Sequence, residues 1–148
     1  MTYHYTDSGL DNVYLVNGYT VHKTPYGEGV SIQDTDSLHA AIAKWIVERP
    51  RPMTGAELRF LRTQMNMTQR NLAAALGSDE QSVRRWEKAK TETVSNGAAD
   101  RLVRLMYCDY VGGDGTLRSI IDRLAELDQV EYEDGRFTEN EGQWRVAA

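Results

Sequence analysis

The sequence predicts an α+β protein in which a small N-terminal antiparallel sheet and one helix precede a mostly helical domain. Apolar residues alternate between positions 13 and 33 around two turn signals, Asn17-Gly18 and Pro25-Tyr26-Gly27. From residue 38 onward, apolar residues mostly recur at the three-to-four-residue spacing of helices. An Arg-Pro-Arg-Pro run at positions 49–52 separates the two patterns and predicts a short, stiff connector.

Charge is distributed unevenly along the chain and locates the surface that can meet nucleic acid. Residues 1–50 carry 3 Lys/Arg against 6 Asp/Glu, residues 51–104 carry 10 against 6, and residues 105–148 carry 4 against 10. The overall charge of −5 excludes a histone-like protein that coats DNA. Only the middle segment is suited to bind phosphate. We therefore expect three parts, at 1–50, 51–111 and 112–148.

Capping residues define the expected helices. Asp36 or Ser37 is expected to cap a helix of roughly three turns that ends before Pro50. Further helices are predicted at about 54–65, 68–76, 79–89, 96–110 and 115–128. Thr54 and Thr68 are the expected N-caps of the first two of these, and Ser78 forms a capping-box pattern with Gln81 for the third.

The last predicted helix has more apolar surface than a small helical core needs, which predicts a partner surface. Its stripe consists of Leu117, Ile120, Ile121, Leu124 and Leu127. This helix is the leading candidate for a dimer interface, and the N-terminal sheet is the other. Residues 130–146 then predict a hairpin around Asp134-Gly135, or alternatively a disordered end over the last dozen residues.

Residues 68–78 have the pattern of a helix-turn-helix. Leu72, Ala73 and Leu76 are placed to face inward, and Gly77 turns the chain. Two helices joined by a short turn containing Gly meet at a steep angle. The helix at 79–89, anchored by Val83 and Trp86, can then enter the DNA major groove.

The exposed positions around this motif predict the contacts with DNA. Arginine suits guanine, glutamine suits adenine and glutamate suits cytosine. The predicted base-reading residues are Glu80, Gln81, Arg84 and Arg85. The predicted phosphate-contacting residues are Thr68, Gln69, Arg70, Ser78, Ser82, Lys88 and Lys90.

This segment resembles the Cro/repressor (XRE) helix-turn-helix family. The resemblance rests on Leu61-Arg62, Thr68-Gln69, Leu72-Ala73, Leu76-Gly77 and the run from Val83 to Glu87. It implies that Gln69 contacts phosphate and braces the recognition helix. It also implies a buried Arg62–Glu87 ion pair that sets the angle of that helix.

Two positions depart from the pattern of the family. Ala89 stands where the family usually has Gly, so the recognition helix is expected to run a residue or two further. Asp79-Glu80 places two acids at the helix N-terminus, which favours the helix but opposes phosphate.

The N-terminal half has a layout similar to MqsA-type (YgiT-like) antitoxin regulators. The similarity rests on the runs at positions 37–42 and 53–58. The zinc ligands of those relatives are absent at positions 24–27. Apolar packing is therefore expected to hold the sheet, through Tyr14, Val16, Tyr19, Val21, Val30 and Ile32.

These features predict a sequence-specific DNA-binding regulator, a homodimeric autorepressor on a pseudo-palindromic operator. An antitoxin that neutralises a partner toxin and autoregulates its operon is the alternative, and a helical interaction module without DNA binding is a third interpretation. No enzyme, cofactor or metal site is expected, because the three histidines are scattered and no catalytic motif is present. One cysteine, Cys108, and no apolar run long enough for a membrane span indicate a cytoplasmic protein.

Overall fold

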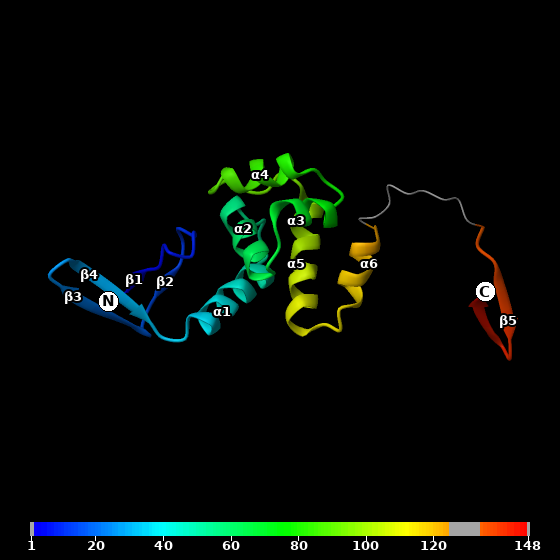
Figure 1. Ribbon diagram of the computed structural model, residues 1–148, viewed down its shortest axis with the longest axis horizontal. Helices are drawn as coiled ribbons and strands as arrows, with labels where there is room; N and C mark the ends of the chain where they lie inside the picture. The colour runs from blue at the N-terminus through cyan, green and yellow to red at the C-terminus, as the bar shows by residue number, and fades with distance from the viewer. Residues whose placement is uncertain (1, 125–133, 148) are drawn as a thin grey trace.

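The computed structural model describes residues 2–124 and 134–147, and it confirms the α+β class. Helices occupy the middle of the molecule, with strands β1 to β4 at one end and the β5–β6 pair at the other end (Figure 1). The elements in chain order are β1 (Tyr3–His4), β2 (Tyr14–Leu15), β3 (Tyr19–Thr24), β4 (Gly27–Ile32), α1 (Thr35–Glu48), α2 (Gly55–Gln64), α3 (Gln69–Ala75), α4 (Glu80–Lys88), α5 (Gly97–Gly112), α6 (Thr116–Leu124), β5 (Phe137–Asn140) and β6 (Gln143–Val146).

The N-terminal strands form two separate antiparallel pairs, β1 with β2 and β3 with β4. The turn at Pro25-Tyr26-Gly27 is present, because Thr24 pairs with Gly27 across it. The prediction that Asn17-Gly18 turns between paired strands is wrong. Gly18, at φ +79°, instead bends the chain, and its carbonyl accepts the N–H of Gln33 at the base of the β3–β4 hairpin.

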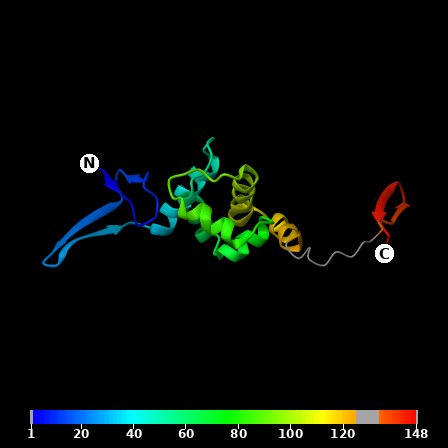
Figure 2. The same cartoon turned by 90° about the horizontal axis from the view of Figure 1, so that it is seen from above.

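The apolar residues expected to hold the N-terminal sheet do so only in part, since three of the six are exposed (Tyr14, Val16 and Val21) and three are half-buried (Tyr19, Val30 and Ile32). Val16 is 76% and Tyr14 is 58% exposed. The β3–β4 hairpin extends away from the helices (Figure 2), so only its base, at Tyr19 and Ile32, packs against the core. The N-terminal segment instead contributes four buried side chains, those of Tyr5, Leu10, Val13 and Leu15.

Helix α1 begins earlier than predicted. Its N-cap is Asp34, in the left-handed region at φ 46°, and the Asp34 carboxylate accepts the N–H of Ser37. The expected caps, Asp36 and Ser37, lie inside the first turn. Arg49 ends the helix in an extended conformation, which is the one that a following proline favours.

The end of α1 and the connector at positions 49–52 are bound by the side chain of Arg104 from α5. The Arg104 Nε donates to Oδ1 of the buried Asp100 at 2.5 Å, and Asp100 Oδ2 accepts the N–H of Met53 at 2.7 Å. The same guanidinium donates to the carbonyls of Ile46, Val47, Arg49 and Arg51. The end of α1 and the start of α2 are thereby tied to α5. The domain boundaries at 50 and 111 stay predictions.

Helix α2 begins with a complete capping box. Thr54 Oγ1 accepts the N–H of Glu57, and the Glu57 carboxylate accepts the N–H of Thr54 while also pairing with Arg49. Glu57 is 1% exposed, so the guanidinium compensates a buried charge. The core continues from this end of α2 through side chains with no exposure, among them Leu58, Leu61, Leu72, Val83 and Val103.

The C-terminal strands form a hairpin, but its turn lies at a different position from the one predicted. Residues 137–140 and 143–146 pair across Glu141 and Gly142, which have φ of 52° and 78°. The predicted turn at Asp134-Gly135 is therefore wrong, and residues 130–133 of that prediction lie outside the described residues. No helix in the described parts of the chain is both long and apolar enough to cross a membrane.

In α6, Ile121 is buried and Leu117 is partly buried, whereas Ile120 is 47% and Leu124 is 55% exposed. Leu127 lies outside the described residues.

Replacing Gly55 by alanine should destabilise the protein. A Cβ at this first position of α2 would overlap the Trp86 carbonyl of α4 and meet the Ala89 carbonyl oxygen at 3.1 Å. We expect Gly55→Ala to lower the free energy of unfolding by about 1–3 kcal/mol in urea denaturation. Gly97→Ala is the matched control, since Gly97 is the first residue of α5 and has nothing within 4 Å. Equal stability of the two variants would contradict the close approach of α2 and α4.

Candidate nucleic-acid interface

Helices α3 and α4 are joined by a tight turn. Thr68 caps α3, as predicted, by accepting the N–H of Asn71 at 3.0 Å. Gly77 adopts φ +65°, a left-handed conformation that glycine takes without strain. The N–H of Ser78 then donates to the Ala73 carbonyl at 2.9 Å. The turn therefore returns the chain directly into α4.

Asp79, and not Ser78, is the N-cap of α4, so the predicted capping box of Ser78 with Gln81 is wrong. The Asp79 carboxylate accepts the N–H of Ser82 at 2.7 Å, and this hydrogen bond lowers the pKa of Asp79. Gln81 is exposed and has no capping role. The amide of Gln81 is consequently available to a ligand.

Helix α4 ends at Lys88, so the expected extension beyond Ala89 is wrong. The chain is turned away there because the first N–H groups of α2 need acceptors. The Lys90 carbonyl accepts the N–H of Ala56 at 3.1 Å, and the Glu92 carbonyl accepts the N–H of Gly55 at 3.0 Å. Backbone bonds from α2 thus end α4 without a glycine at position 89.

The inner face of α4 packs on α2 and α3. Val83 is completely buried, Trp86 is 8% exposed and Glu87 is 6% exposed. Leu72 and Ala73 of α3 are buried and Leu76 is partly buried. The two predicted anchors, Val83 and Trp86, therefore leave the opposite face of the helix in solvent.

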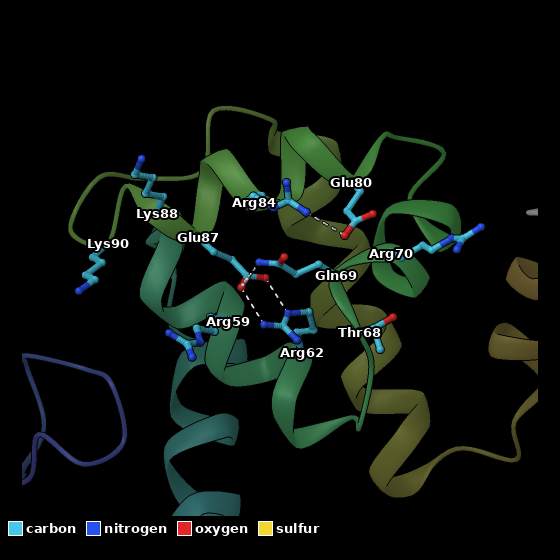
Figure 3. A pocket seen from close by; sticks show the side chains of 10 residues that line it. All are labelled: Arg59, Arg62, Thr68, Gln69, Arg70, Glu80, Arg84, Glu87, Lys88 and Lys90. Carbon is cyan, nitrogen blue, oxygen red and sulfur yellow. Dashed lines mark hydrogen bonds and ion pairs between the residues drawn. The ribbon is translucent and has the colours of Figure 1, made fainter.

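The ion pair between Arg62 and Glu87 is present in the structure and is bidentate. Arg62 Nε lies 2.7 Å from Glu87 Oε2, and Nη2 lies 2.8 Å from Oε1. A third guanidinium nitrogen donates to the Met67 carbonyl at 2.9 Å, and Gln69 Nε2 donates to Glu87 Oε1 at 3.2 Å. One carboxylate therefore joins α2, the start of α3 and the end of α4 (Figure 3).

A groove opens over this ion pair and gathers most of the predicted site. Figure 3 shows Arg62, Gln69 and Glu87 at its centre, with Glu80 and Arg84 beside them. The full lining is Arg59, Arg62, Thr68, Gln69, Arg70, Glu80, Arg84, Glu87, Lys88 and Lys90. Arg59 is the one lining residue that the sequence analysis missed. Its spacing of three residues from Arg62, which places both on one face of α2, was the available signal.

The remaining four predicted residues do not line the groove. Gln81 and Arg85 are exposed on α4, while Ser78 and Ser82 are half-buried. Arg85 donates to Ser82 Oγ at 3.5 Å. The base-reading set is thus divided between Glu80 and Arg84 at the groove and Gln81 and Arg85 outside it.

The acidic and basic groups of the groove are only partly paired. Glu80 and Arg84 form an exposed i,i+4 ion pair at 3.0 Å. Arg59, Arg70, Lys88 and Lys90 are exposed and form no ion pair within the described residues. The surface around α4 therefore retains uncompensated positive charge that can bind phosphate.

The histidines make separate contacts. His4 bonds to the Asp11 carbonyl, His22 to Ser31 Oγ and His39 to the Tyr5 hydroxyl. In the described part of the chain, no three His, Cys, Asp or Glu side chains come together as metal ligands.

Comparison with known proteins identifies the central segment. Residues 58–94 match the family model described as Helix-turn-helix, which is of the XRE type. No curated protein and no solved structure matches the chain. The match runs from within α2 to beyond α4 and includes the groove, so this part of the chain is similar to helix-turn-helix domains of the DNA-binding, transcription-regulating kind.

Breaking the Arg62–Glu87 pair from one side should strongly destabilise the protein. We expect Arg62→Met to lower the free energy of unfolding by about 3–5 kcal/mol, because it leaves the Glu87 charge buried without its guanidinium. The double variant Arg62→Met/Glu87→Met should recover most of this loss in the same urea titration. A double variant as unstable as the single one would contradict the assignment of the loss to the orphaned charge.

Proposed function

We propose that the chain is a sequence-specific transcription regulator that represses its own operon as a dimer bound to a pseudo-palindromic operator. The observation that carries the proposal is the exposed face of α4, which offers Gln81, Arg84 and Arg85 on a helix whose inner face is fixed by Glu87. An α-helix fits the major groove, and these side chains are those that recognise bases there.

The four base-reading candidates have different roles in this proposal. Arg85 and Gln81, at the exposed surface, reach guanine and adenine. If the ion pair between Arg84 and Glu80 opens on DNA, Arg84 reaches guanine and Glu80 accepts a hydrogen bond from cytosine. If the pair stays closed, Glu80 orients the Arg84 guanidinium.

Phosphate contacts then set the register of α4 on the duplex. Thr68, Gln69 and Arg70 lie together at the N-terminus of α3. Lys88 and Lys90 lie at the other end of the groove. Ser78 and Ser82 flank the N-cap of α4 and are proposed to donate hydroxyl groups to the backbone.

The dimer is proposed to form through α6. One short recognition helix reads only a few base pairs, and a two-fold axis doubles the site. Exposed Ile120 and Leu124 next to buried Ile121 give α6 an apolar face that is only partly covered. A second copy of the same face would cover it in an isologous contact.

Removal of the arginines should weaken sequence preference while leaving general affinity. We expect each of Arg84→Ala and Arg85→Ala to reduce discrimination between operator and random duplex by about 1–3 kcal/mol, with residual salt-sensitive binding. Footprinting on the promoter of the protein's own operon measures this. An unchanged footprint in the double variant would exclude α4 as the recognition helix.

A charge on the apolar face of α6 should separate the copies. Leu124→Asp is expected to yield a monomer in light scattering and to weaken operator binding, because one half-site alone is then held. Ser119→Asp, an exposed position elsewhere on α6, is the control. A Leu124→Asp variant that remains dimeric and binds operator normally would remove α6 from this role.

A second candidate function, an antitoxin that masks a partner toxin, is favoured by the surface of the N-terminal part. A shallow apolar groove between β2 and α1 includes Tyr14 and Trp45, both substantially exposed. The groove lies in residues 1–50, whose net negative charge suits a basic partner. The discriminating observation is whether a neighbouring open reading frame encodes a small basic protein that binds residues 1–50.

A further inference from the structure

Paired and unpaired charges occupy different parts of the groove. The ions at its centre are compensated, since Arg62 pairs with Glu87 and Arg84 pairs with Glu80. The uncompensated cations lie at two opposite ends (Figure 3). Arg70 is at one end beside Thr68, and Arg59, Lys88 and Lys90 are at the other.

The cluster of Arg59, Lys88 and Lys90 draws on two elements and the chain that follows them. Arg59 comes from the exposed side of α2, Lys88 is the last residue of α4, and Lys90 lies two residues beyond it. All three are exposed, so binding an anion costs little desolvation of the protein. The chain turn after α4, held by the Lys90 carbonyl on the N–H of Ala56, keeps this end of α4 next to α2.

The N-terminal part of the chain does not neutralise this cluster. Arg59 and Lys90 also line a second cavity, whose opposite wall includes Asp7, Ser8 and Gly9. Asp7 forms no ion pair with either cation in the residues that the structure describes. The cations therefore keep their charge for a ligand from outside.

We propose that Arg59, with Lys88 and Lys90, forms a second phosphate-contact cluster, which binds one DNA strand while Thr68, Gln69 and Arg70 bind the other. A recognition helix inserted in the major groove has one sugar-phosphate backbone on each side. Two cationic clusters at opposite ends of the groove match that arrangement. The inference rests on the proposed function, to which it adds Arg59 and the division of contacts between strands.

The test measures how binding depends on salt. Each phosphate contact adds about 0.9 to the slope of log Kobs against log salt on B-form DNA. We expect Arg59→Ala to weaken binding by the same factor on a random-sequence duplex and on a duplex selected by the unmutated protein, and to reduce the slope by about 1. Arg101→Ala, which removes an exposed cation of α5 that does not line the groove, should change neither quantity.

Phosphate ethylation interference on the selected duplex then tests the division between strands. Arg59→Ala should lose interference at phosphates on one side of the major groove, and Arg70→Ala should lose it on the other. An unchanged slope and interference pattern for Arg59→Ala, alongside the expected losses for Arg70→Ala, would overturn this inference and leave the proposed function standing. Failure of the unmutated protein to bind either duplex would overturn the proposed function itself.

Discussion

The carboxylate of Glu87 is buried on the inner face of α4, and the orientation of that helix depends on how the charge is compensated. A buried ion without partners costs several kcal/mol, so Glu87 requires donors in fixed positions. Arg62 of α2 provides two and Gln69 of α3 provides one. Because these donors come from separate helices, α4 cannot rotate without losing at least one hydrogen bond. The ion pair therefore specifies an orientation more than it adds net stability.

A DNA-binding surface must both attract the duplex and discriminate between bases, and in the proposed function different parts of the groove above Glu87 do each. Cations at its two ends attract any duplex, whatever its sequence. The paired Glu80 and Arg84 contribute little net charge, so in the proposed function their role is to accept or reject particular bases. The two acids at the start of α4, Asp79 and Glu80, oppose phosphate and would weaken binding to any duplex. Under the proposed function, affinity and discrimination thus arise from different residues of one surface.

Sequence reasoning was most successful where local signals decide the structure. Thr54 and Thr68 cap their helices, Gly77 makes its turn, and Val83 with Trp86 faces the core, because each depends on residues within one or two helical turns. The caps of α1 and α4 were misplaced by one to three residues, to Asp36 or Ser37 and to Ser78. Neighbouring residues there are equally good caps, and the path of the incoming chain selects Asp34 and Asp79.

Features that depend on distant parts of the chain were not predicted. Arg104 contacts carbonyls 53 to 58 residues earlier in the sequence, and Asp100 contacts Met53, 47 residues away. No periodicity or motif connects such positions. The same holds for the exposed β3–β4 hairpin, where alternation predicted a packed face but tertiary structure leaves most of it uncovered. The candidate site was therefore predictable in Arg62 and in its residues on α3 and α4, whereas Arg59 was missed although its helical spacing from Arg62 was a usable signal.

Because Arg104 of α5 binds the end of α1 and the connector, and α2 also packs on α5, both α1 and the helix-turn-helix are positioned by α5. If the chain binds DNA as proposed, a molecule that binds α1 changes the free energy of DNA binding when it favours an arrangement of the connector that also moves α2 and α4. Thermodynamic reciprocity then requires DNA to change the affinity for that molecule by the same factor. Under the proposed function, the four carbonyls that Arg104 binds would be the contacts through which the N-terminal part and operator DNA affect each other's binding.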